Sequence, residues 1–323
     1  MKQKIAALLC AWLIVAPLAS PAAAQDFPVR PLKIVQGFAP GGNADIIARI
    51  LAQEMAKGLG QPIVVESRPG AGGNIGAEAV AKATPDGHTM LLVTGGHTVS
   101  GALYKALPYD PVESFEMVGI VTQFQFLILT RADSKLQTMS ALLERARARP
   151  GSITYGSAGV GSTQHLIGEL VASMGKVDLL HVPYKGDAAA FTGMFGGEVD
   201  FVAAPPTVAL GQLKAGKVRA LAVTGNTRWN TLPNVPTIVE SGVPGYDVRS
   251  WAGLATTAGT PKAVVERLNA ELKRASLVPE VRAKLEEMGG EVRASTPAEM
   301  KARVAGDLQG WVRVIKDAKI PQQ

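Results

Sequence analysis

Residues 32–59, LKIVQGFAPGGNADIIARILAQEMAKGL, contain the pattern on which the fold prediction rests. The β-branched run at 32–35 predicts a buried strand, and the glycine-rich segment 38–45 follows it. From residue 45 to 59 apolar side chains recur on one helical face, and Gly60 follows as a stop signal. The stretch therefore predicts a strand, a tight turn and a helix, which is the unit that builds α/β domains.

The same unit recurs along the chain, and it predicts two series of strands and helices. Further strands are expected at residues 63–66, 90–94, 118–121, 127–130, 153–155, 179–184, 200–203 and 218–224. Further helices are expected at residues 74–83, 139–148, 163–174, 188–195 and 208–214. Start signals for C-terminal helices stand at Thr260-Pro261, Pro279 and the capping box Thr296-Pro297-Ala298-Glu299. Two such series favour two lobes, each a mostly parallel sheet flanked by helices.

Residues 1–24 have the pattern of a signal peptide. Two lysines precede the apolar run 5–15, and Ala22-Ala23-Ala24 offers a cleavage site before Gln25. The apolar run is too short to span a bilayer. We therefore expect an exported protein, located in the periplasm.

Cleavage would change both the charge and the cysteine content of the chain. It removes two lysines and no acids, which lowers the formal net charge from +6 to +4, and it removes Cys10, the one cysteine in the sequence. A mature chain without cysteine has no disulfide and no thiolate nucleophile. Its mild positive charge does not predict nucleic-acid binding.

Three glycine-rich segments each follow a predicted strand and open a predicted helix. They are 38–45 (FAPGGNAD), 69–76 (PGAGGNIG) and 156–163 (GSAGVGST). Glycine lets backbone N–H groups approach a ligand, and the N-terminus of a helix favours an anion. The segments match neither the dinucleotide fingerprint nor the P-loop. Any one of them could be only a tight turn, whereas the three together indicate an anion held by backbone amides.

Metal binding and catalysis have little support in the sequence. The four histidines, His88, His97, His165 and His181, lack metal-ligand spacing, so no metal site and no cofactor are expected. A serine nucleophile at Ser157 or Ser162 would need a nearby histidine and acid. We therefore expect no catalytic residues, with an enzyme that uses one of these serines as an alternative.

Many short motifs, in order along the mature chain, resemble one family of receptors. They are Phe27-Pro28-Val29-Arg30-Pro31, FAPGG at 38–42 with Asp45, ESRPGAGG at 66–73, PDGHT at 85–89, LPYDP at 107–111, residues 159–166, VPYKG at 182–186, LAVT at 221–224, PNVPT at 233–237 and GTP at 259–261. The family is that of the solute receptors of tripartite tricarboxylate transporters, also called Bug receptors.

The resemblance implies a two-lobed periplasmic binding protein of type 2, in which two lobes close on a ligand by hinge motion. Lobe 1 would comprise residues 25–122 and 249–323, and lobe 2 residues 123–248. The expected ligand is a small carboxylate, such as an organic acid, a dicarboxylate or an aromatic acid. The expected partner of the monomeric receptor is a transporter of one large and one small membrane subunit. A receptor that signals to a membrane sensor kinase is the alternative.

The resemblance also implies which residues bind the ligand. In lobe 2, backbone amides and hydroxyls of the 157–163 loop would hold a carboxylate, and ordered waters would help bridge lobe 1 to the ligand. The expected ligand-binding positions are Phe38, Ala39, Pro40, Gly41, Gly42, Asp45, Gly73, Asn74 and His97 in lobe 1, and Ser157, Ala158, Gly159, Gly161, Ser162, Thr163 and Ala204 in lobe 2.

The chain departs from the family pattern at three places. Gln36-Gly37-Phe38 stands where relatives commonly have Val-Pro-Phe, and Ala203-Ala204-Pro205 where many have Phe-Asp-Asn, which disfavours a ligand ammonium group. Asp187 stands where relatives usually have Gly or Ser. If it faces the cleft, it would disfavour a second ligand carboxylate unless Lys185 pairs with it. Alternatively, both are solvated loop residues.

Overall fold

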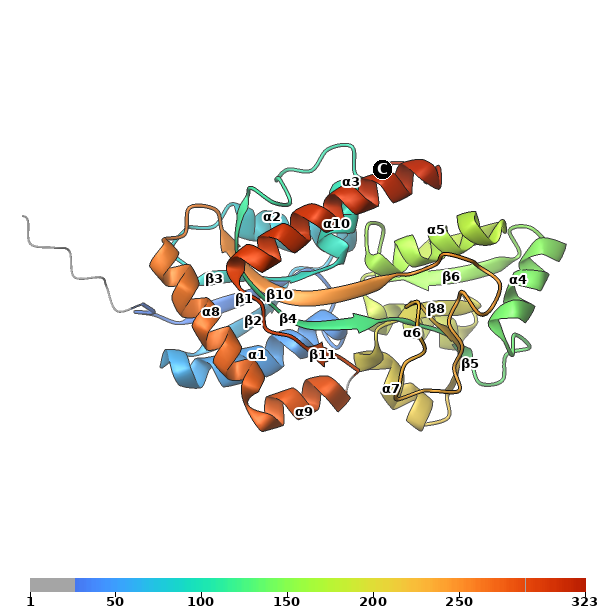
Figure 1. The fold of residues 1–323 in the computed structure, drawn as a ribbon, viewed down its shortest axis with the longest axis horizontal. Helices are drawn as coiled ribbons and strands as arrows, with labels where there is room; N and C mark the ends of the chain where they lie inside the picture. Colours follow the sequence, from blue (N-terminus) through green and yellow to red (C-terminus); the bar gives the residue numbers. More distant parts are fainter. Residues whose placement is uncertain (1–26, 288) are drawn as a thin grey trace, which may run out of the picture.

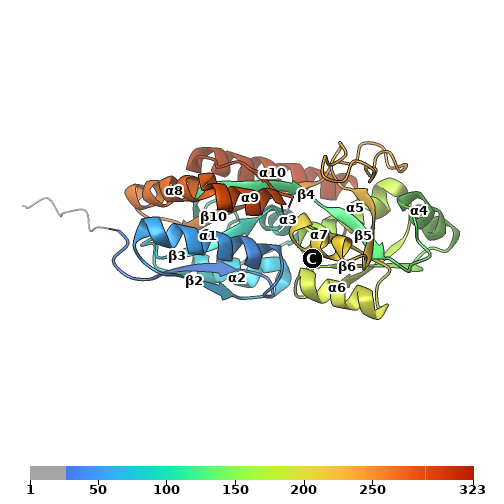
Figure 2. The ribbon, with the colours of Figure 1, turned by 90° about the horizontal axis from the view of Figure 1, so that it is seen from below.

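The computed structural model describes residues 27–287 and 289–323, so the expected signal peptide lies outside the described residues. Two helix-flanked sheets lie end to end along the long axis of the molecule (Figures 1 and 2). The two-lobed α/β fold expected from the sequence is confirmed.

The first sheet has the strand order β11–β4–β10–β3–β1–β2. Its strands are β1 (Leu32–Gln36), β2 (Ile63–Ser67), β3 (Thr89–Thr94), β4 (Phe115–Gln125), β10 (Arg249–Thr257) and β11 (Glu291–Val292). The helices of this lobe are α1 (Asn43–Leu59), the 3₁₀ turn η1 (Ala71–Gly73), α2 (Asn74–Ala81), α3 (Gly96–Leu103), α8 (Lys262–Leu277), α9 (Pro279–Glu287) and α10 (Pro297–Asp317).

Alternate side chains of the first sheet pack into two separate cores. Ile34 and Leu92 belong to a core with the buried sides of α1 and α8. Val35 and Leu91, their neighbours in sequence, belong to a core with α2 and α10. Because successive side chains of a strand point to opposite faces, this sheet is buried on both sides, which explains the nearly continuous apolar strands in the sequence.

The second sheet has the strand order β7–β6–β8–β5–β9. Its strands are β5 (Leu127–Arg131), β6 (Ile153–Ser157), β7 (Leu179–Pro183), β8 (Phe201–Ala204) and β9 (Val218–Val223). Its helices are α4 (Met139–Ala148), α5 (Thr163–Gly175), α6 (Asp187–Gly196) and α7 (Pro206–Lys214). Helices α4 and α5 pack into one core, and α6 and α7 into another, so this sheet is also covered on both faces.

The prediction that both sheets are mostly parallel is wrong, because both are mixed. In the first sheet β1 is parallel to β2 and β3, but β10 is antiparallel to β3 and β4, and β11 is antiparallel to β4. In the second sheet β6 is parallel to β7 and β8, while β5 is antiparallel to β8 and β9. Two of the reversed strands, β5 and β10, are those with which the chain enters the second sheet and later returns to the first.

Two strands connect the sheets, and they run side by side (Figure 1). β4 stays in the first sheet to Gln125, and β5 begins in the second sheet at Leu127. The chain returns after β9 and enters the first sheet as β10. The division into lobes after residues 122 and 248 remains a prediction; in the structure the first sheet extends to Gln125 before the first crossing and resumes at Arg249 after the second.

Three local features differ from the sequence prediction. β10 and α3 were not predicted, because their sequences, RSWAGLATT and GHTVSGAL, contain small residues in place of a β-branched run or a strong apolar stripe. Thr260 does not cap α8, whose N-cap is Pro261; its hydroxyl donates to the Thr257 carbonyl instead. The capping box of α10 is confirmed.

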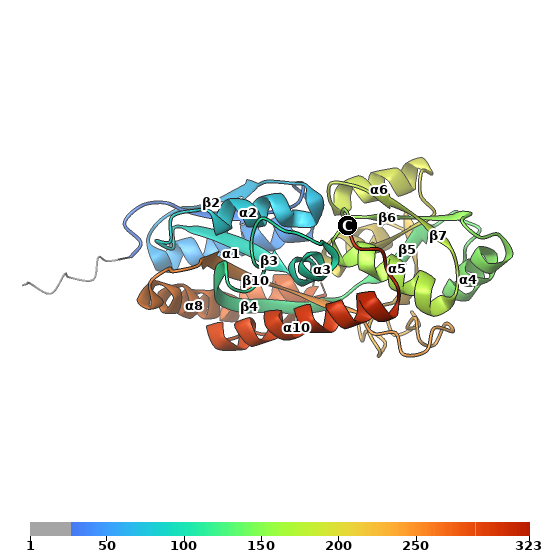
Figure 3. The same cartoon turned by 90° about the horizontal axis from the view of Figure 1, so that it is seen from above.

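Helix α10 crosses the first lobe and ends against the second. Its buried residues Met300 and Val304 pack on the first sheet. Just beyond its C-terminus, the Ala318 carbonyl accepts a hydrogen bond of 3.1 Å from Ser173 in α5 (Figure 3).

The start of α10 gives a stability prediction. The Thr296 side chain accepts from the Glu299 N–H at 3.2 Å, and Glu299 accepts from the Thr296 N–H at 2.7 Å. Replacing Thr296→Ala removes the first bond, and we expect the free energy of unfolding to fall by about 1 kcal/mol in urea titrations. Thr296→Ser keeps the hydroxyl and is the control, so an equal loss in both variants would contradict the capping role.

Candidate ligand-binding cleft

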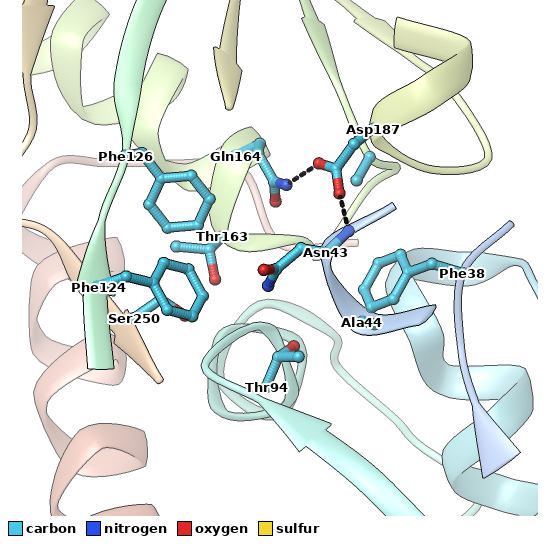
Figure 4. A pocket seen from close by; sticks show the side chains of 11 residues that line it. Phe38, Asn43, Ala44, Thr94, Phe124, Phe126, Thr163, Gln164, Asp187 and Ser250 are labelled. Carbon is cyan, nitrogen blue, oxygen red and sulfur yellow. Dashed lines mark hydrogen bonds between the residues drawn. The ribbon is translucent and has the colours of Figure 1, made fainter. Parts of the chain in front are cut away.

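A cleft lies between the lobes, beyond the C-terminal ends of β1 and β6. Its lining comes from both lobes and from the connecting strands: Phe38, Asn43, Ala44, Thr94, Phe124, Phe126, Ala158, Thr163, Gln164, Asp187 and Ser250 (Figure 4). This is the place where open α/β sheets usually bind ligands.

One part of the cleft wall is apolar. Phe124 at the end of β4 and Phe126 just after it have ring centroids 5.5 Å apart in an edge-to-face arrangement. Phe38, from the loop after β1, lies on the opposite side of the cleft in Figure 4. These rings offer contact area to an apolar or aromatic ligand body.

Two helices begin at the cleft, one from each lobe. α1 begins at Asn43, after Gly42, and α5 begins at Thr163, after the N-cap Ser162. The first backbone N–H groups of a helix have no partner inside the helix, and the helix dipole places partial positive charge there. None of the described residues that line the cleft is Lys or Arg. Oriented amides are therefore the groups that can attract an anion in it.

Asp187 is the acidic residue of the cleft, and it joins the two lobes. One of its carboxylate oxygens accepts a hydrogen bond from the Asn43 N–H at 3.0 Å, and the other accepts from the Gln164 side-chain amide at 2.7 Å (Figure 4). The side chain is 7% exposed. Burial raises the pKa of Asp187 by more than the two hydrogen bonds lower it, so the pKa of this carboxyl group lies above its usual value. Lys185, by contrast, is exposed, so the expectation of a solvated loop residue holds for Lys185 and is wrong for Asp187.

Further hydrogen bonds hold the lobes together around the cleft. The Ala39 N–H donates to the Lys185 carbonyl at 2.9 Å, and Thr207 donates to the Asn43 side chain at 2.8 Å. Ser100, in α3 of the first lobe, donates to the Gly161 carbonyl of the second lobe at 3.2 Å. The structure is therefore the closed form of the two lobes.

A second pocket, of about 280 Å³, lies within the first lobe and shares Phe38 and Thr94 with the cleft. Asn74 lines it, and its side-chain oxygen accepts from the Tyr109 hydroxyl at 2.8 Å. Its amide nitrogen is buried and has no hydrogen-bond partner among the described residues. This donor can bind a water or a ligand oxygen in the second pocket.

His97 also lines the second pocket. Its Nε2 lies 2.8 Å from the Pro111 carbonyl oxygen, and its ring stacks on Tyr109. Burial lowers the pKa of His97 to about 4. At neutral pH it is therefore an uncharged side chain and does not supply a positive charge for an anion.

The family profile described as "Tripartite tricarboxylate transporter family receptor" matches residues 47–320. The chain belongs to this receptor family. A solved structure described as periplasmic binding protein BugD is 36% identical, with a TM-score of 0.88, and the match covers 92% of this chain and all of that one.

Two other similar structures, both from Rhodopseudomonas palustris, contain ligands. MatC with bound malate is 34% identical, with a TM-score of 0.86, over 90% of this chain and 100% of the other. A protein determined with adipate is 34% identical, with a TM-score of 0.87, over 92% and 99%. The recognition of the family from its motifs is confirmed, and so is the expectation of a binding protein that is not an enzyme.

The structure brings some of the residues expected from this receptor family to the two pockets. Phe38, Ala158 and Thr163 line the cleft. Gly73, Asn74 and His97 line the second pocket, again with Phe38.

The other expected positions support the walls and are not lining residues. Most belong to the turns before α1 and α5: Ala39, Pro40, Gly41 and Gly42 in the first lobe, and Gly159, Gly161 and Ser162 in the second. Asp45 lies in the first turn of α1, and Ser157 is the last residue of β6. Asp45, for example, accepts from the Gly41 N–H at 3.0 Å and from Arg49 at 2.9 Å. Ala204 is buried at the end of β8. Ligand contact by any of these residues remains a prediction.

Several lining residues were missed by the sequence prediction. Asn43, Ala44 and Gln164 lie within one or two residues of predicted positions, so the glycine-rich turns could have pointed to them. Thr94, Phe124, Phe126 and Ser250 lie at strand ends or on the connecting strands, where no local motif marks them. Only the arrangement of the sheets brings these four to the cleft.

The serine residues considered as nucleophiles are structural. Ser157 is fully buried; its Oγ lies 2.7 Å from His181 Nε2 and accepts from the Gly159 N–H at 3.1 Å. Ser162, equally buried, caps α5 by accepting from the His165 N–H at 3.2 Å. Both hydroxyls take part in hydrogen bonds that shape the loop.

Residues 27–287 and 289–323 contain neither a metal cluster nor a membrane-spanning helix. No cluster of three or more His, Cys, Asp or Glu side chains there has the arrangement of a metal site. None of the helices in the same ranges is long and apolar enough to cross a membrane.

Two stacked histidines lie beneath the 157–163 loop, and they predict a pH dependence. The ring centroids of His165 and His181 are 4.2 Å apart. Burial, and secondarily His165, lowers the pKa of His181 to about 3. In the unfolded chain an imidazole takes up its proton near pH 6.5, so the unfolded state binds more protons below that pH and stability falls as the pH drops.

We therefore expect the wild-type protein to lose about 1–2 kcal/mol more stability between pH 6.5 and 5.0 than His181→Gln. Urea titrations of both proteins at each pH give the comparison. Because the substitution also changes the absolute stability of the protein, the result to compare is the slope of the free energy of unfolding against pH. Parallel slopes would show that His181 takes up its proton equally in both states.

Proposed function

We propose that this protein is a periplasmic receptor that captures a small organic acid between its lobes. It then delivers the acid to a tripartite tricarboxylate-type transporter of one large and one small membrane subunit. Residues 1–24 would direct its export and be removed. The proposal rests on one observation above all: the N-termini of α1 and α5 converge on a closed, cation-free cleft between the lobes.

The chemistry of this cleft suits a carboxylate that is bound and not changed. The N–H groups at the start of α5, near Thr163 and Gln164, can donate to carboxylate oxygens, and such charge-assisted bonds are stronger than neutral ones. The Thr163 hydroxyl adds a further donor at the same place. Malate in one relative and adipate in another support this ligand class.

Capture requires the lobes to open, and the connecting strands provide the hinge. Phe124 on β4 and Ser250 on β10 line the cleft and also belong to these strands. A ligand that contacts them would stabilise the closed form, which is the form that we propose the transporter recognises.

The first test is a thermal-shift screen of organic acids on protein freed of ligand by unfolding and refolding. A ligand at 100 times its Kd should stabilise the fold by about 2.7 kcal/mol, so selected acids should raise the Tm measurably. Sugars and cationic amines are the negative controls. If no acid in a broad panel shifts the Tm, the carboxylate-receptor proposal fails.

The second test changes the contact between Gly161, in the 157–163 loop of the second lobe, and Ser100 of the first lobe. Gly161 has φ +83°, and a Cβ there would lie 2.5 Å from the Ser100 hydroxyl and 2.8 Å from the Tyr104 ring. Gly161→Ala should therefore weaken binding of the most stabilising acid about tenfold. Alanine is strained in the left-handed backbone conformation, and its Cβ opposes closure of the two lobes.

Gly211→Ala is the matched control for this variant. Gly211 lies in α7, and a Cβ there would meet no described atom within 4 Å. Isothermal titration should give wild-type affinity for this control. If Gly161→Ala binds the acid with wild-type affinity, the contact of this loop with the first lobe is not needed for ligand binding.

A further inference from the structure

The cleft contains a carboxylate of its own. Asp187 is the first residue of α6 and lines the cleft, and both of its oxygens accept hydrogen bonds from amide groups. No ion pair in the described ranges involves Asp187. Its carboxyl group is thus held by amides and a helix terminus, which is the kind of environment expected for a ligand carboxylate.

Asp187 takes up the anion position at the start of α1. Its Oδ2 bonds to the Asn43 N–H, the first N–H of that helix, and a Cβ added to Gly42 would lie 3.0 Å from the same oxygen. A ligand carboxylate cannot occupy this position while Asp187 is there. The start of α5, at Thr163, remains available to it.

The rest of the cleft offers nothing to balance a second ligand charge. Phe38, Phe124 and Phe126 supply apolar surface, and Figure 4 shows the Thr94 and Thr163 hydroxyls directed toward the same central space. None of the described lining residues is Lys or Arg. A second ligand carboxylate would therefore share a small cleft with the Asp187 carboxyl group, and no Lys or Arg among the described lining residues would offset the repulsion between the two groups.

We propose that Asp187 is a resident carboxylate that fills one of two anion positions, so that the receptor selects acids with a single carboxylate and an uncharged remainder. This inference rests on the proposed function, and it narrows the ligand class. It predicts that this chain does not share the preference of relatives that were solved with malate or adipate.

Three six-carbon acids test the inference, because they differ only at the far end. Hexanoate has one carboxylate, adipate has two, and 6-aminohexanoate has a carboxylate and an ammonium group. We expect isothermal titration of the refolded wild-type protein to give at least tenfold tighter binding of hexanoate than of adipate. Butanoate with succinate, and benzoate with terephthalate, repeat the comparison for shorter and aromatic bodies.

The variant Asp187→Asn keeps the shape of the side chain and removes its charge. We expect the ratio of adipate to hexanoate affinity to rise at least tenfold in this variant. Asp178→Asn, which removes one exposed acid from the same lobe away from the cleft, is the matched control and should leave the ratio unchanged. If Asp187→Asn does not fold, Asp187→Ser replaces it, and the wild-type preference is measured in any case.

Each result has one meaning. If Asp187→Asn loses affinity for all acids by the same factor, Asp187 serves only to link the two lobes, and the inference is overturned. If the wild type binds adipate as tightly as hexanoate, or more tightly, the inference is overturned, but the proposal of a carboxylate receptor is not. Tighter binding of 6-aminohexanoate, lost in Asp187→Asn, would make Asp187 a counter-ion for a ligand cation, which also overturns it. If none of the seven acids binds, the inference falls, and the broad organic-acid screen then decides separately whether the proposed function falls with it.

Discussion

The antiparallel pairing of β4 with β10 is the interaction on which the arrangement of the lobes depends. The pairing runs from Phe115 and Thr257 to Gln125 and Arg249, with bulges between Ala252 and Gly253 and between Leu254 and Ala255. Bulges bend and twist a strand pair, so this ladder can lead out of one sheet toward the other. At Gly253 the strands approach so closely that a Cβ would overlap the Gly119 carbonyl.

The same strand pair connects the hinge to the core and to the cleft. Trp251 in β10 is fully buried, and its indole N–H donates to Asp307 of α10 at 2.8 Å. The adjacent Ser250 and, on β4, Phe124 line the cleft. Movement of the lobes therefore changes the ligand site directly. In the proposed function oriented amides bind the anion, which avoids the desolvation cost of a buried Lys or Arg.

The sequence predicted local units well and their long-range arrangement poorly. The turn before α1, the capping box at Thr296 and the helix that begins at Thr163 depend on neighbouring residues, and the structure contains all of them. The direction of β10 and its place between β3 and β4 depend on contacts across more than a hundred residues. The position of Asp187 likewise depends on packing, since one of its hydrogen-bond partners, Asn43, belongs to α1 of the other lobe.

The order of the strands also determines when each sheet can be completed as the chain is made or exported. All five strands of the second sheet lie within residues 127–223, so this sheet can assemble as soon as that segment has emerged. The first sheet cannot, because β10 separates β3 from β4 and comes only at Arg249–Thr257. Until then β4 has no neighbour that joins it to β3, and the N-terminal half-sheet has an open edge. Closing that edge requires contacts of high sequence separation, which form slowly. The lobe that the chain begins is therefore the lobe that it finishes last.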